Sequence, residues 1–349
     1  METQLLPTHT PLPAVDAAYD PTLLTEDTDE YCWTPLQLAS RGGDLQTVRE
    51  ILEANPLAAN EPARGYYGQT ALQAACIHGH EDIVRLLVEA GADIHFSGGN
   101  NMQRNALQFA CGQGNERVVE FLLSHGAEVN TLRDSRQGRV ASSSTDRHRS
   151  INAAEASSSS LSSASPKTAV TRYNGRTALQ AASERGHAHL VGRLLNLGAD
   201  VNAPPSSTAG LTALQGACVN GFAGIVSILL EHGADVNGAA AKYKGKTALQ
   251  AACLKGHAGI VDMLLDAGAD VHALGGNNGD ATALHAAAEA GNAAIVTRLV
   301  EAGANVNDGG GRGQSPVQSA ARNGREDVVQ LLRGLGAVGR SGGGKLCFS

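Results

Sequence analysis

The amino-acid sequence predicts an all-α solenoid of about eight helix–turn–helix repeats with β-hairpin fingers between them. The first observation is an internal period, because a small polar residue recurs at intervals of 36, 35, 72, 35, 35, 35 and 33 residues. These eight repeat origins are Thr34, Thr70, Asn105, Thr177, Thr212, Thr247, Thr282 and Ser315. The second observation is a glycine nine residues after every origin, followed in seven copies by another glycine twenty-one residues after it. The third is a set of apolar residues at helical spacing between the two glycines.

Each repeat is expected to begin with a short helix, which the sixth copy illustrates. Thr247 can cap this helix because its hydroxyl can accept a hydrogen bond from a free amide of the first turn. Leu249, Ala252 and Cys253 then share one face at helical spacing. Gly256 suits the left-handed conformation that commonly ends a helix.

A second helix is expected to follow the first. Its apolar stripe consists of Ile260, Val261, Leu264 and Leu265, and Gly268 ends it. The chain then runs through an extended loop toward the next copy. One unit has nothing of its own against which to bury this stripe, so neighbouring repeats must stack.

The first and last repeats depart from this pattern. The first has Thr47 at the start of its apolar stripe, and the eighth has Arg333 at the end. Because terminal repeats need a polar outer face, we expect the array to be complete. The first repeat also has Asn55 in place of the second glycine, and asparagine is the next residue to tolerate the left-handed region.

The first-helix sequence carries a family resemblance. Residues 70–75 read Thr-Ala-Leu-Gln-Ala-Ala, and residues 34–36 read Thr-Pro-Leu. With the period, these residues resemble the ankyrin-repeat family, whose first helix typically reads Thr-Pro-Leu-His-x-Ala. The glutamine form is similar to fungal ankyrin arrays, and the repeats cover about three quarters of the chain. The resemblance implies protein binding through the concave face and the finger tips.

Glutamine occupies the histidine position of that signature in seven copies, and His285 occupies it in the other. In ankyrin proteins this histidine usually bonds to the backbone of a neighbouring loop. A glutamine amide offers both a donor and an acceptor, so it can serve the same structural role.

Composition narrows the class of protein. The net charge of −7 argues against an extended nucleic-acid interface, which needs a basic face. No apolar run reaches the roughly 18 residues of a membrane helix. Residues 1–30 contain no Lys or Arg, so they lack the basic region of a signal or transit peptide. We therefore expect a monomeric cytoplasmic or nuclear protein.

Four of the six cysteines share one repeat position, six residues after the origin. They are Cys76, Cys111, Cys218 and Cys253. Other repeats have serine or alanine there, which indicates a slot for a small side chain. Equivalent helices lie about 8–10 Å apart, whereas a disulfide needs Cα atoms within about 7 Å, so we expect neither disulfides nor shared metals.

Five segments follow from these patterns. Residues 1–30 form an acidic leader that cannot fold alone, 31–130 hold repeats one to three, and 175–338 hold repeats four to eight. Residues 131–174 break the period with serines and basic residues, and 339–349 form a glycine-rich tail. We interpret 131–174 as a flexible basic insertion, and a decayed repeat is the alternative.

Two short motifs suggest enzymatic chemistry, and we reject both. Residues 240–247 match a permissive phosphate-binding loop, but no buried strand is expected before them, and Gly-x-Thr recurs in other repeats. Residues 339–343 read Gly-Arg-Ser-Gly-Gly like a nucleophile elbow, without a strand to shape the turn. The histidines likewise follow repeat positions and do not form a ligand cluster. We predict no catalytic residue, cofactor or metal.

The predicted partner-binding residues lie at the finger tips. Tyr66, Tyr173 and Tyr243 each lie two residues before the glycine that leads into a repeat, and Lys244 and Lys246 lie nearby. Tyrosine is a favoured interface anchor, although each ring could instead pack on the next hairpin. The predicted function is a scaffold or adaptor that binds a partner protein. A transcriptional co-regulator that uses the acidic leader is the alternative, and a nucleotide-binding enzyme is a remote one.

Overall fold

The computed structural model describes residues 33–63, 68–97, 104–130, 176–206, 210–243, 245–276, 281–311 and 313–338. These residues form eight pairs of α-helices and one short 3₁₀ helix, η3 (Pro56–Asn60). The first helices of the pairs are α1 (Pro35–Gly42), α3 (Ala71–His78), α5 (Ala106–Gln113), α7 (Ala178–Arg185), α9 (Ala213–Asn220), α11 (Ala248–Lys255), α13 (Ala283–Ala290) and α15 (Pro316–Arg322). The second helices are α2 (Leu45–Ala54), α4 (Glu81–Glu89), α6 (Glu116–Ser124), α8 (Ala188–Asn196), α10 (Ala223–Glu231), α12 (Ala258–Asp266), α14 (Ala293–Glu301) and α16 (Glu326–Gly334). The predicted helical solenoid is confirmed.

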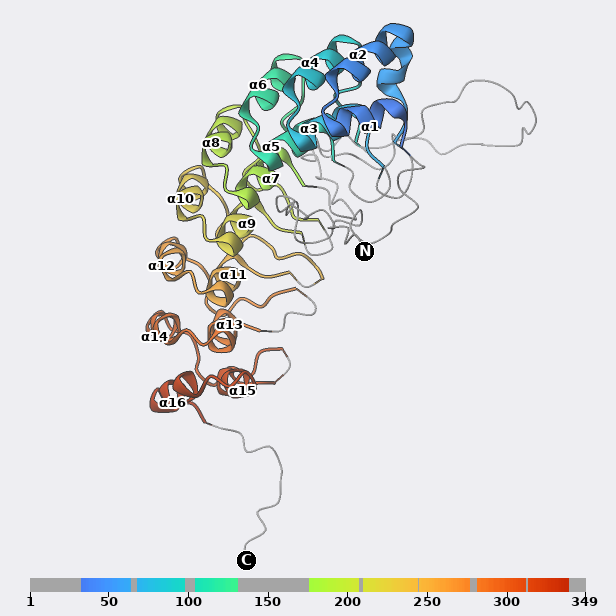
Figure 1. Cartoon of the computed structure of the whole chain (residues 1–349). Coiled ribbons are helices and arrows are strands. Elements are labelled where there is room, and N and C mark those ends of the chain that lie inside the picture. The colour runs from blue at the N-terminus through green and yellow to red at the C-terminus, as the bar shows by residue number, and fades with distance from the viewer. Residues whose placement is uncertain are drawn as a thin grey trace, which may run out of the picture.

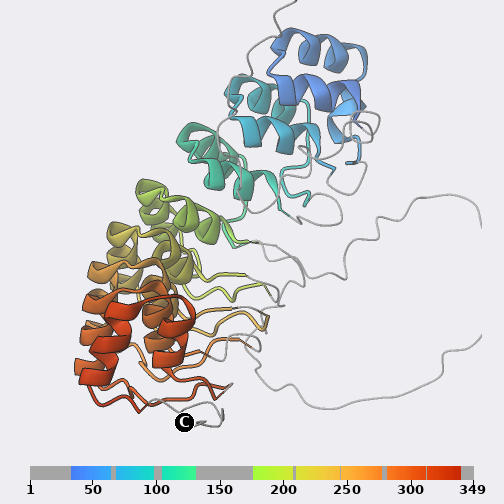
Figure 2. The ribbon, with the colours of Figure 1, turned by 60° about the horizontal axis from the view of Figure 1, so that its bottom comes forward.

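The two kinds of helix form two curved layers. Figure 1 shows the first helices on the inner side of the arc and the second helices on the outer side. Each first helix packs on the first helix of the next repeat, including α5 on α7. The loops that join successive repeats project from the inner side (Figures 1 and 2). The inner helices and these loops together form the concave side of the array.

The predicted helix caps are also confirmed. Thr247 Oγ1 accepts a hydrogen bond from Gln250 N at 3.2 Å, and Gln250 Oε1 accepts one from Thr247 N at 3.1 Å. This reciprocal arrangement satisfies two backbone amides that the first turn would otherwise leave unpaired. Gly256 closes α11 with a φ of 79°. The glycines at both repeat positions have positive φ throughout the array.

Asn55 contradicts the expectation for the first repeat. Its φ of −147° and ψ of 90° are extended and not left-handed. The residue after it, Pro56, begins η3. A proline ring clashes with an α conformation at the preceding residue, so Asn55 is driven to extended geometry. The η3 turn therefore replaces the glycine stop in this repeat.

The β-hairpin fingers are not seen as paired strands. Within the described residues, the connecting loops contain an isolated β-bridge residue, Tyr243, and no strand. The loops leave the array in the expected direction, but side chains of the first helices hold them, as described below. The insertion at 131–174, the leader at 1–30 and the tail at 339–349 lie outside the described residues.

The core is one continuous cluster of small and aliphatic side chains along the array. The predicted small-residue slot holds four buried, unpaired cysteines. Burial raises the pKa of the Cys111, Cys218 and Cys253 thiols to about 12. At the same slot, the hydroxyl oxygens of Ser40 and Ser183 are buried and find no hydrogen-bond partner among the described residues. A thiol or a methyl group therefore suits the slot better than a hydroxyl does.

Candidate interaction surface

In five of the repeats the first-helix glutamine holds the loop that follows. Gln250 Nε2 donates to Ala273 O at 2.7 Å and to Ala281 O at 2.9 Å. These two carbonyls lie on the outgoing and returning limbs of the same loop, so one buried amide ties both limbs to α11. Gln73 bridges Phe96 O and Arg104 O in the same way. The predicted structural role of this glutamine is confirmed.

His285 fills the same role in the seventh repeat. Its Nδ1 lies 3.2 Å from Thr282 N, and its Nε2 lies 2.6 Å from Gln314 O. Thr282 N donates to Nδ1, so Nε2 carries the proton that is donated to Gln314 O. The ring thus spans the cap of its own helix and the next loop, as the glutamine amides do elsewhere.

Histidines at the start of second helices join neighbouring repeats. His80 Nε2 lies 3.1 Å from Arg41 O, and His187 Nε2 lies 3.1 Å from Gly112 O. His257 approaches Val219 O at 3.4 Å in the same position. Each ring contacts the first helix of the preceding repeat, close to the glycine that ends that helix. Among the described residues no group of three or more His, Cys, Asp or Glu side chains could hold a metal ion.

An asparagine clamp forms a third contact between repeats. Asn202 Nδ2 donates to Gly233 O at 3.0 Å, and its Oδ1 accepts from Asp235 N at 2.8 Å. Asn130 makes the same pair of bonds to Gly198 O and Asp200 N, which joins repeat three directly to repeat four. The side chains of Asn60, Asn237 and Asn307 repeat this geometry.

The aspartates that follow the second helices stabilise their own turns. Asp235 Oδ1 accepts from Asn237 N at 2.9 Å, and Asp270 Oδ1 accepts from His272 N at 2.8 Å. Asp93 and Asp200 do the same. Each of the four carboxylates therefore stabilises the turn of its own repeat.

The loop before the sixth repeat is a tight turn locked onto its neighbour. Gly245 lies so close to Ala241 that an added Cβ would stand 2.2 Å from Ala241 O. Gly276 of the following loop donates its N–H to Gly245 O at 3.0 Å. A Cβ on Gly276 would likewise stand 2.1 Å from Ala241 O. These contacts fix the backbone that carries Tyr243.

Tyr243 lies at the surface of this turn, with its side chain 45 % exposed. Lys242 Nζ lies 5.4 Å from the centroid of the Tyr243 ring, within the range of a cation–π contact. Lys246, at the base of the same loop, is exposed. The other predicted partner-binding residues, Tyr66, Tyr173 and Lys244, lie outside the described residues. The tyrosine row as a whole therefore stays a prediction.

Sequence reasoning missed Leu274, which lies on the loop after the sixth repeat and is 50 % exposed. Because the bond between Gly276 and Gly245 joins the two loops, Leu274 and Tyr243 belong to adjacent fingers. A large aliphatic residue in an otherwise small-residue loop is the signal that could have identified it. These two exposed apolar side chains give the concave side candidate anchors.

The phosphate-loop match at 240–247 does not build a phosphate cradle. Thr247 Oγ1 accepts from Gln250 N and so serves as a helix cap. Lys246 is exposed, and the residues before Ala241 form no strand. The geometry supports our rejection of this motif. The second motif, at 339–343, lies outside the described residues.

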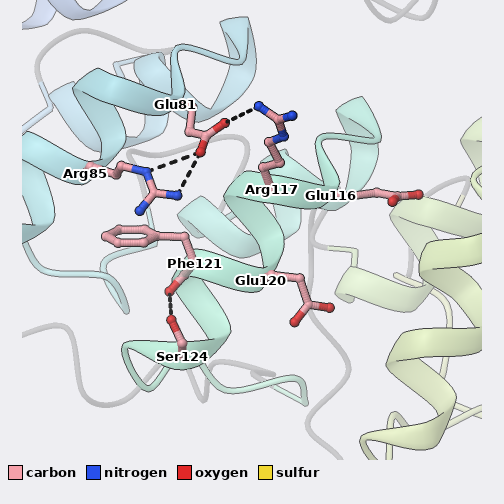
Figure 3. A pocket seen from close by; sticks show the side chains of 7 residues that line it. All are labelled: Glu81, Arg85, Glu116, Arg117, Glu120, Phe121 and Ser124. Atoms are coloured by element: carbon pink, nitrogen blue, oxygen red, sulfur yellow. Dashed lines mark hydrogen bonds and ion pairs between the residues drawn. The ribbon is translucent and has the colours of Figure 1, made fainter.

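A shallow pocket on the outer layer lies between α4 and α6 (Figure 3). Arg85 pairs with Glu81 at 2.8 Å and stacks its guanidinium 4.7 Å from the Phe121 ring centroid. Arg117 approaches the same Glu81 at 3.8 Å. Glu120, at the edge, pairs with Arg193 of the next repeat at 2.7 Å. These charged groups are engaged with one another, which indicates a stabilised junction between repeats.

The comparisons with known proteins agree with the architecture. A family model described as ankyrin repeats in three copies matches residues 15–98, 36–133, 153–239, 202–275 and 274–338. A 60-residue stretch is 42% identical to part of tyrosine-protein kinase HTK16 of Hydra vulgaris, and it covers 17% of this chain and 8% of that protein. No helix of the described residues is long and apolar enough to cross a membrane. Because the family matches extend over most of the chain, it belongs to the ankyrin-repeat family.

Proposed function

We propose that this protein is an interaction scaffold or adaptor that binds a partner protein through its concave face and finger tips. Ankyrin repeats generally mediate protein–protein interactions, and the family is typically non-enzymatic. The observation that carries the proposal is the pair of exposed apolar side chains, Tyr243 and Leu274, on two fingers locked together by backbone contacts. Tyrosine is among the residues that contribute most of the binding free energy at protein interfaces, and an exposed leucine on the adjoining finger adds apolar surface that a partner can bury.

The remaining surface of the inner layer supports this choice. Apolar residues of α11 and α13 are buried where neighbouring repeats pack together, so a partner cannot contact them. These residues are Leu249, Ala252, Leu284 and Ala287. The side-chain amides of the first-helix glutamines, which we call the glutamine ladder, are hydrogen-bonded to the loops, as Gln250 shows. The loop side chains, together with the exposed residues at the ends of these helices such as Lys255 and Glu289, are therefore the groups left to contact a partner.

The test compares cross-linked capture from native cells with the full-length chain and two variants. Tyr243→Ala removes a finger anchor, whereas Leu57→Ala removes a side chain that is 84 % exposed in η3, away from the fingers. We expect Tyr243→Ala to lose the specific partners and Leu57→Ala to retain them, with similar melting temperatures for both. Equal capture by the two variants would refute a finger interface.

We also propose that the chain works as a monomer in the cytoplasm, the nucleus or both. Size-exclusion chromatography with light scattering checks the first point, and imaging of the tagged full-length chain checks the second. A mass of two protomers would contradict the monomer.

A further inference from the structure

The charges of the fifth and sixth repeats are segregated by layer. The loop and first-helix segments, 203–222 and 238–257, contain four lysines and no carboxylate. The second-helix and turn segments, 223–237 and 258–272, contain five carboxylates and neither lysine nor arginine. In these two repeats the loops and first helices therefore carry only basic charges, while the second helices and the turns after them carry only acidic ones, although the whole chain has a net charge of −7.

Three of these four lysines lie in the part of the chain that the structure describes. Lys242, Lys246 and Lys255 are exposed and form no ion pair with any described residue. The contrast is with the fourth repeat, where Arg176 holds the position of Lys246 and pairs with Glu184 at 2.5 Å. In the sixth repeat Leu254 stands at the position of that glutamate. The charge of Lys246 in the sixth repeat is therefore not neutralised by a glutamate, whereas the charge of Arg176 in the fourth repeat is.

Lys242 lies next to an exposed apolar side chain on a loop whose described backbone is tightly packed. Lys242 lies beside the Tyr243 ring, and Leu274 is exposed on the adjoining finger. The close approaches of Gly245 and Gly276 to Ala241 fix both loops. A fixed site loses less conformational entropy on binding than a flexible one does.

We propose, on the basis of the function proposed above, that the fingers around the sixth repeat bind an acidic segment of a partner protein that carries an apolar side chain. The apolar side chain contacts Tyr243 and Leu274, and the flanking carboxylates pair with Lys242 and Lys246. Opposite charge across an interface raises the association rate and excludes basic competitors. A membrane or a nucleic acid fits less well, because the acidic outer layer would repel an extended polyanion.

The test is selection from a random peptide library displayed on phage, with the full-length chain as bait. We expect enrichment of peptides in which Asp and Glu flank a Leu, Phe or Trp. In solution the double variant Lys242→Glu with Lys246→Glu should bind the best peptide at least 10-fold more weakly, because two attractions become repulsions. The matched control reverses two exposed arginines of the outer layer, Arg49→Glu with Arg333→Glu, and should bind it unchanged.

A charge swap separates recognition from a structural effect. The same peptide with its acids replaced by lysine should bind the Lys242→Glu, Lys246→Glu variant better than it binds the wild-type chain. Enrichment of basic or uncharged peptides, no enrichment, or failure of the swap would overturn the inference. So would tighter binding to phosphatidylserine vesicles or to a single-stranded oligonucleotide than to the peptide. If cellular partners are lost with Tyr243→Ala but kept with the lysine reversals, the scaffold function stands and the acidic partner does not.

Discussion

Replacement of the glycines that end the helices tests how neighbouring repeats are coupled. Gly221 closes α9 with a φ of 79°, and Gly198 follows α8 with a φ of 81°. An L-residue in this region costs about 1–2 kcal/mol. Gly198→Ala should cost that much and no more, because no neighbouring atom lies within 4 Å of the added Cβ.

Gly221→Ala should cost more than Gly198→Ala does. Its Cβ would stand 2.7 Å from Cε1 of His257, so the ring must move away from Val219 O. Loss of that hydrogen bond adds about 0.5–1.5 kcal/mol, which gives a total of about 1.5–3.5 kcal/mol. The difference between the two losses of unfolding free energy measures the contact between repeats. The loss that both variants share measures the backbone strain.

Urea denaturation followed by circular dichroism measures both losses, and a double-mutant cycle isolates the excess. With His257→Ala in the background, Gly221→Ala should fall to the cost of Gly198→Ala, because the ring that blocks the Cβ is gone. Equal costs for the two glycines, or an additive cycle, would show that His257 does not transmit the effect. The slopes of the denaturation curves must be compared as well, since long arrays can lose two-state behaviour.

Four further predictions concern stability and reactivity. Ser183→Ala should stabilise the protein by about 1 kcal/mol in the same denaturation assay, because it removes a buried hydroxyl without a partner in the described residues; a loss of stability would reveal a partner. His272→Asn should raise the free energy of unfolding by about 1 kcal/mol, because it supplies the asparagine clamp that Asn202 and Asn237 provide in the two preceding repeats. An unchanged urea midpoint would show that the clamp does not contribute to stability. Iodoacetamide at pH 8 should leave the Cys111, Cys218 and Cys253 thiols unmodified in the native chain and label them in denaturant, because burial raises their pKa to about 12; rapid native labelling, read by mass spectrometry, would contradict their burial. Replacement of 133–170 by a short Gly/Ser linker should leave cooperative unfolding intact, because Asn130 already joins Gly198 and Asp200; loss of cooperativity would favour the decayed-repeat interpretation.

The sequence was sufficient to predict the helices because each boundary depends on one local residue. Thr247 caps α11 and Gly256 ends it, whatever the neighbouring repeats contain. Asn55 departs from the prediction because the following proline decides its conformation, so the residue at the repeat position does not act alone. The hairpin strands were expected from the family resemblance. In the described residues the first-helix glutamines hold the loop limbs directly, as Gln250 does through Ala273 O and Ala281 O.

The candidate site was harder to predict, because it depends on which side chains the stacking leaves exposed. Gly245 and Gly276 meet across a gap of 31 residues, so only the folded array places Leu274 beside the Tyr243 finger. Lys246 resembles Arg176 in repeat position, and the difference lies in Leu254 replacing Glu184 at a second position. Whether the charge at the Lys246 position is neutralised depends on the residue at a second position of the same repeat, and a linear motif does not show that dependence.

The contacts that build the array and the residues that can recognise a partner occupy different repeat positions. The helix caps, the glutamine ladder and the asparagine clamps use the same positions in repeat after repeat, so a change at any of them weakens stacking. Within the described residues, the side chains of Tyr243 and Leu274 make no such bond. Substitution there can alter the partner at little cost in folding free energy, because the backbone beneath is held by Gly245, Gly276 and Gln250. Specificity in this chain is therefore expected to reside in the side chains of the fingers, and stability in the ladder beneath them.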